Sequence, residues 1–151
     1  MELQFKRLSD NRKVDLISYV SEYLKQNPET EVYVGCDSQV HGRWTDFGMV
    51  IVLHKNKAGG HVLYATSRVE RIRDKFIRLW TEVEHSINLA AHLSASSIPI
   101  KFVDVDLNPD PRWGSNTVLR SAMGYIEAMG FTPRCKPDAV SASYVADKIC
   151  K

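Results

Sequence analysis

Residues 31–40, with the sequence EVYVGCDSQV, form the most regular apolar stretch of the chain. In an extended strand, Val32, Val34 and the other even-numbered residues point to one side, and Tyr33 points to the opposite side. Both sides are then largely apolar, which is typical of a strand that is covered on each face of a sheet. The pattern therefore predicts a central strand, with Asp37 at its carboxyl end.

Two further apolar stretches follow after short polar connections. His41 and Gly42 indicate a turn, residues 47–53 a second strand, residues 56–60 another turn, and residues 61–66 a third strand. Three consecutive strands with connections this short are typical of an antiparallel meander.

The apolar spacing changes near Arg71 from every second residue to every third or fourth, which indicates helices packed on the sheet. Ser9, Asp10 or Asn11 is expected to cap an N-terminal helix that runs to about Gln26. The remaining predicted elements are a long helix over residues 71–95, a fourth strand over residues 100–107, a helix from Ser115 or Asn116 to Met129, a short strand over residues 131–135, and a last helix over residues 138–151.

These elements predict an α/β fold with a mixed sheet of about five strands, the first three antiparallel, and helices on both faces. The chain of 151 residues is 44% hydrophobic and 25% charged, enough for one core, and contains no linker or repeat. We therefore expect one domain over residues 1–151, in which residues 1–28 contribute the extra N-terminal helix.

The composition of the chain excludes only a few classes of function. The three cysteines are far apart and form no CxxC pair, so neither a disulfide framework nor a zinc site is predicted. No apolar run is long enough to span a bilayer and no signal sequence is evident, so a cytoplasmic protein without a membrane partner is expected. A net charge of +2 permits a nucleic-acid partner without requiring one.

Several short motifs resemble a known family. The strings GCDSQ, TEVEHS, DVDLNPD, GF with KPDAVSAS, and YVADK are similar to those of the YkuK-like family of predicted ribonuclease-H-like proteins, over residues 32–151. The order of strands and helices also resembles ribonuclease-H-like domains. This resemblance implies a site with one Asp on the first strand, a Glu on the long helix, an Asp at the end of the fourth strand and an Asp on the last helix. The corresponding residues are Asp37, Glu82, Asp106 and Asp147.

Chemistry supports a metal at such a site. Carboxylates held close together raise one another's pKa unless a cation neutralises them, and a donor set made only of oxygen favours Mg²⁺ or Mn²⁺. Periodicity alone does not choose between Glu82 and Glu84, and the resemblance favours Glu82. Asp104 and Asp106 share one face of the fourth strand, and Asp106 is preferred because it is nearer the end. For any single acid, such as Asp37, the alternative is a turn or a solvated carboxylate.

The predicted function is a divalent-metal-dependent nuclease or phosphodiesterase that hydrolyses RNA or an RNA-containing duplex. The alternatives are a noncatalytic nucleic-acid-binding module and a structural or assembly protein with the same fold. The basic run over residues 68–78 is interpreted as a solvated helix face rather than a phosphate-binding stripe. Arg112 and Trp113 would stack a base or close their loop. The residues predicted to contact substrate are Ser38, Gln39, Arg112, Trp113 and Lys136.

Overall fold

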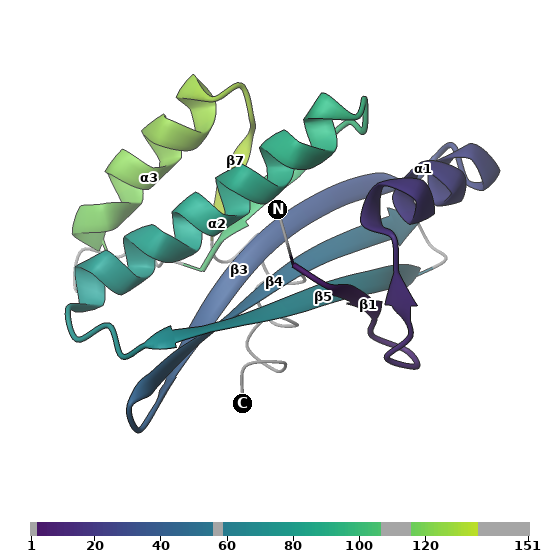
Figure 1. Cartoon of the computed structure of the whole chain (residues 1–151). Coiled ribbons are helices and arrows are strands. Elements are labelled where there is room, and N and C mark those ends of the chain that lie inside the picture. The colour runs from purple at the N-terminus through teal and green to yellow at the C-terminus, as the bar shows by residue number, and fades with distance from the viewer. Residues whose placement is uncertain (1–2, 56–58, 107–115, 136–151) are drawn as a thin grey trace.

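The computed structural model describes residues 3–55, 59–106 and 116–135, which form a mixed sheet and three helices (Figure 1). No helix among these residues is long and apolar enough to cross a membrane. The elements in chain order are β1 (Phe5–Arg7), β2 (Lys13–Val14), α1 (Leu16–Gln26), β3 (Glu31–His41), β4 (Trp44–Lys55), β5 (Gly59–Glu70), α2 (Lys75–Ala95), β6 (Phe102–Val105), α3 (Asn116–Ala128) and β7 (Pro133–Cys135).

The sheet has seven strands in the order β2-β1-β5-β4-β3-β6-β7. Strands β3, β4 and β5 form the predicted antiparallel meander, and β6 then pairs parallel to β3 after the α2 crossover. Strand β7 adds parallel to β6. The meander is longer than the apolar runs suggested, because polar residues such as the paired Asp46 and Arg68 at one end, and Lys55 at the other, continue the strands.

The prediction of five strands was wrong because it missed the N-terminal hairpin. Strands β1 and β2 extend the sheet beyond β5, joined by a turn in which Asn11 takes a positive φ of 58°. Helix α1 consequently begins at Leu16 rather than near residue 10, and Asp15 is its N-cap, accepting from the Ser18 amide at 3.3 Å. Residues 1–28 therefore hold a hairpin as well as a helix.

Strand β3 lies between β4 and β6, as its two apolar sides predicted. Val32, Val34 and Cys36 join the main core, whereas Tyr33 packs in a second cluster on the opposite face with Val50, Val52, Val62 and Phe102. Both sides of the strand are thus buried.

The three helices contribute to the main core and cover the same face of the sheet (Figure 1). Val20 of α1, Ile87 of α2 and Ile126 of α3 are nearly or fully inaccessible to solvent. Helix α2 begins at Lys75, later than predicted, because the Asp74 side chain accepts from the amides of Phe76 and Ile77 and so caps the helix. Helices were predicted on both faces, but no helix among the described residues covers the other face; the last predicted helix, residues 138–151, lies outside the described residues.

Candidate functional site

Asp37 lies within its strand rather than at the end of it, next to the position where the pairing with the neighbouring strand β6 stops. Strand β3 continues past it to His41 and remains paired with β4, so the predicted strand end was wrong. On the other side of β3, however, the pairing with β6 ends at the pair formed by Gly35 and Asp104. Asp37 is 8% exposed and accepts from the Ser38 amide at 2.8 Å. It therefore lies beside the place where the neighbouring parallel strand stops.

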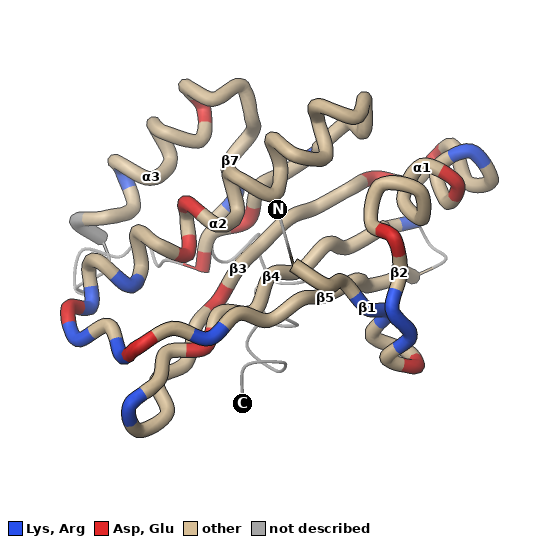
Figure 2. The backbone as a smooth tube through the Cα atoms, viewed as in Figure 1, with Lys and Arg blue, Asp and Glu red and all other residues tan. Residues whose placement is uncertain are grey.

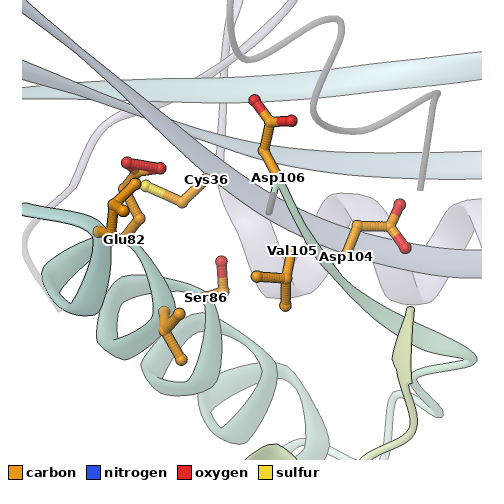
Figure 3. A pocket seen from close by; sticks show the side chains of 8 residues that line it. Cys36, Glu82, Ser86, Asp104, Val105 and Asp106 are labelled. Carbon is orange, nitrogen blue, oxygen red and sulfur yellow. The ribbon is translucent and has the colours of Figure 1, made fainter. Parts of the chain in front are cut away.

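Asp106 follows β6 directly and lies beside the same position, where the pairing of β3 with β6 stops. Asp37 and Asp106 are each two residues beyond the last paired positions, Gly35 and Asp104, so both belong to the next row of the same sheet face. Figure 3 shows Asp104 and Asp106 on the side of β6 opposite to Val105, which points towards α2. The register therefore brings two carboxylates onto one face at neighbouring strand positions.

Glu82 approaches from helix α2 and is 6% exposed. Its Oε2 accepts a hydrogen bond of 2.9 Å from the Ser38 hydroxyl, next to Asp37 in the chain. Glu82 and Asp106 also line one small cavity of about 10 Å³ together with Cys36 and Ser86 (Figure 3). Helix α2 thus places a carboxylate against the strand that carries Asp37.

Electrostatics link the three carboxylates. Burial raises the pKa of Glu82 well above its usual value, and the charges of Asp37 and Asp106 raise that pKa further. The Ser38 hydrogen bond and the Arg78 charge act in the opposite direction. The neutral form of Glu82 is therefore favoured, and a cation between these groups would relieve the repulsion.

Ser38 and Arg78 support Glu82 from one side. The Nη1 atom of Arg78 donates to the Ser38 hydroxyl at 2.9 Å, and that hydroxyl donates in turn to Glu82. Ser38 is 3% exposed, so its hydroxyl is directed into the protein in this arrangement, and neighbouring Gln39 is only partly buried. Arg78 was missed in the sequence, although its position four residues before Glu82 on a helix places both on the same side.

The two alternative acids have other surroundings. Glu84 is exposed on α2 and borders a separate hollow with Phe76 and Trp80. Asp104 is buried and pairs in a bidentate manner with Arg134, whose Nε and Nη2 donate at 2.8 and 2.9 Å. Asp104 also lines the small cavity shared by Glu82 and Asp106, so its pairing with Arg134, rather than its position, distinguishes it from Asp106.

The described carboxylates are the right type of ligand for a metal, but they do not by themselves form a complete metal site. Carboxylate oxygens suit Mg²⁺ or Mn²⁺. Within residues 3–55, 59–106 and 116–135, however, no three His, Cys, Asp or Glu side chains are arranged to hold one ion. The other residues predicted for the site lie outside the described residues: Arg112, Trp113, Lys136 and Asp147.

Comparison with known proteins identifies the family of the chain. No curated protein matches the sequence significantly. The family described as ribonuclease H-like matches residues 15–151, which cover the meander, α2, β6, α3 and β7. The mixed α/β sheet with its antiparallel opening and parallel additions is consistent with that fold. The chain therefore belongs to the ribonuclease H-like family.

Proposed function

We propose that the protein is a divalent-metal-dependent nuclease or phosphodiesterase that hydrolyses RNA or an RNA-containing duplex. The observation that carries the proposal is the contact of the buried Glu82 with Ser38, which places this carboxylate of α2 next to Asp37 of β3, with Asp106 at the end of the neighbouring β6. A buried carboxylate such as Glu82 destabilises the fold when other carboxylates repel it, so this arrangement favours a role with a cation. Family membership adds the expectation of a nucleic-acid substrate.

In this proposal Asp37, Glu82 and Asp106, with Asp147, hold Mg²⁺ or Mn²⁺. A bound divalent ion would lower the pKa of its water and offset the charge that develops on the phosphate. The hydrogen bond from Ser38 keeps the Glu82 carboxylate oriented towards β3, and Arg78 holds the Ser38 hydroxyl in place. Ser38 is therefore assigned a positioning role in addition to the predicted substrate contact.

Substrate contacts are proposed for Gln39, Arg112, Trp113 and Lys136. Gln39 continues β3 beyond Asp37, towards the hairpin that joins β3 to β4. Arg112 and Trp113 are proposed to hold a base and a phosphate, and Lys136 a phosphate. Their loss should mainly raise KM, because they act on binding rather than on the reacting atoms.

The test compares matched carboxamide variants of the full chain. Asp37→Asn, Asp106→Asn and Glu82→Gln should lose hydrolysis of RNA and RNA–DNA hybrid oligonucleotides in Mg²⁺ or Mn²⁺, and EDTA should stop the wild type. Glu84→Gln is the control, because it changes the same residue type on an exposed position of the same helix. Calorimetry should detect divalent-ion binding that is lost in Asp37→Asn.

Equal activity in the Glu82→Gln and Glu84→Gln variants would contradict the assignment of the site. Nucleic-acid binding without hydrolysis in any divalent metal would refute the nuclease and favour the noncatalytic binding module. Neither binding nor hydrolysis would favour a structural or assembly role.

A further inference from the structure

A second cluster of charge lies at the hairpin end of the sheet. Figure 2 shows basic residues gathered where the β3–β4 turn, the end of β5 and the start of α2 meet. The fold joins these segments directly, since the Arg71 amide donates to the Arg43 carbonyl at 2.9 Å and the Arg71 guanidinium donates to the Gly42 carbonyl at 3.0 Å. The sequence interpretation of a solvated helix face does not describe this cluster, because residues 71–73 precede α2 and Arg43 comes from a distant turn.

The cluster surrounds a hollow of about 410 Å³. We call it the basic hollow; its lining residues are Gly42, Arg43, Glu70, Arg71 and Arg73. The hollow is thus bordered by three arginines and one carboxylate, and all four charged side chains are exposed.

The arginines of the basic hollow outnumber the carboxylates beside them. Asp46 pairs with Arg68 through contacts of 2.7 and 2.9 Å, which leaves Glu70 and the exposed Asp74, the N-cap of α2, against the three arginines. Among the described residues, Glu70 is the one carboxylate that lines the hollow. Arg43 is further oriented by Trp44, with its guanidinium 5.0 Å from the ring centroid. Arginines are suited to phosphate because they present several donors in a planar fork.

The basic hollow lies on the same strand as the candidate site. Ser38 contacts Glu82, and Gly42 follows four residues later along the β3 hairpin. At a rise of about 3.3 Å per residue, this separation is about 13 Å. The rise of a duplex is about 3.4 Å per nucleotide along its axis, so this separation corresponds to about four nucleotides along the axis. A nucleic acid bound along β3 is therefore long enough to reach both places.

We infer that the basic hollow binds backbone phosphates of the nucleic-acid substrate, about four nucleotides away from the bond presented to Asp37, Glu82 and Asp106. The inference rests on the proposed function for the substrate class, and assigns to Arg43, Arg71 and Arg73 the task of holding the strand. Contacts to phosphate carry no sequence information, so the hollow contributes affinity and register rather than sequence specificity.

The experiment measures binding of an RNA–DNA hybrid to the full chain by fluorescence anisotropy, in EDTA so that hydrolysis does not interfere. Kd is measured over a salt series for the wild type and for Arg43→Ala, Arg73→Ala and the double variant. Each lost phosphate contact should reduce the slope of log Kd against log salt by about 0.9, so the change in Kd between about 50 and 200 mM salt shrinks about threefold per contact.

Two variants provide matched controls. Lys25→Ala removes one exposed charge from α1, at the opposite end of the sheet, and should leave the slope unchanged. Glu70→Gln removes the negative charge from the basic hollow and should strengthen binding, opposite in sign to the arginine variants. Circular dichroism and thermal unfolding confirm that each variant is folded.

The outcomes separate this inference from the proposed function. If the slope of log Kd against log salt is the same for the Arg43→Ala, Arg73→Ala double variant as for Lys25→Ala, the inference is overturned, even if the wild type cleaves the hybrid. Hollow-dependent binding without cleavage in any divalent metal supports the inference and overturns the nuclease proposal. Absence of binding in the wild type at low salt overturns the inference as well.

Discussion

The buried pair of Asp104 and Arg134 offers a stringent test of the contacts that hold β7 on the sheet. The Asp104 side chain is 0% exposed and that of Arg134 is 18% exposed. The guanidinium also lies over the neighbouring rings of Tyr33 and Phe102, 4.5 Å from each centroid. Asp104 raises the pKa of Arg134, as expected for a cation held by a buried carboxylate.

The Arg134→Met variant keeps an aliphatic side chain against the two rings but leaves the buried Asp104 carboxylate without its cation. Breaking a buried pair in this way should cost about 3–5 kcal/mol of unfolding free energy. Asp104→Asn leaves a guanidinium that still contacts both rings and reaches water, so the expected cost is about 1–3 kcal/mol. The double variant should be about as stable as Asp104→Asn, which predicts a coupling energy equal to the cost of Arg134→Met, about 3–5 kcal/mol.

Urea unfolding of the wild type, the two single variants and the double variant at pH 7 measures this coupling by linear extrapolation. The slopes of the transitions must agree, so that the four free energies refer to the same unfolding reaction. A coupling energy below about 0.5 kcal/mol would refute the reasoning, because that is the value of a solvent-exposed pair.

Two other predictions concern α2. The raised pKa of Glu82 means that the folded state binds the proton of this carboxyl more tightly than the unfolded state does. The stability that this proton contributes is therefore fully present below the unfolded pKa of about 4.5. It is lost as pH rises through the folded pKa. Glu82→Gln should therefore gain stability relative to wild type as pH rises above that value, measured by urea unfolding across pH; a difference independent of pH would contradict the assignment. Asp74→Ala removes the acceptor for the amides of Phe76 and Ile77 and should lower the unfolding free energy by about 1 kcal/mol. Asp74→Asn keeps a capping oxygen and should retain most of the wild-type stability. Equal thermal midpoints for wild type and Asp74→Ala would argue against the cap.

The central part of the fold could be predicted because its residues follow a clear period. Alternation over β3 placed Val34 and Tyr33 on opposite buried faces, and spacing of three and four residues identified α2. The N-terminal hairpin had no such signal, since β1 and β2 are only three and two residues long. Three possible caps near residue 10 also obscured Asp15, the residue that begins α1.

The candidate site could be predicted only as a set of acids. Glu82 and Glu84 lie on opposite sides of one apolar stripe, and only the packing of α2 on β3 distinguishes the buried residue from the exposed one. The bond from Arg78 to Ser38 likewise joins two segments that are distant in the chain. The basic hollow required the fold for the same reason, because Arg43 and Arg71 meet only when the β3–β4 turn contacts the end of β5.

The topology of the sheet also has a consequence for the order of folding. Val34 pairs with Ile51 across a short hairpin, whereas its other partner, Val103, lies beyond β5 and the whole of α2. Contacts between residues close in sequence cost less chain entropy and form sooner, so the β3–β4–β5 meander is expected to form a nucleus on which β6 and β7 dock later. Destabilising changes in β7 should then mainly accelerate unfolding, while changes in the meander should slow folding. Because Asp106 follows β6, the carboxylates would come together only in this late step, after most of the core is in place.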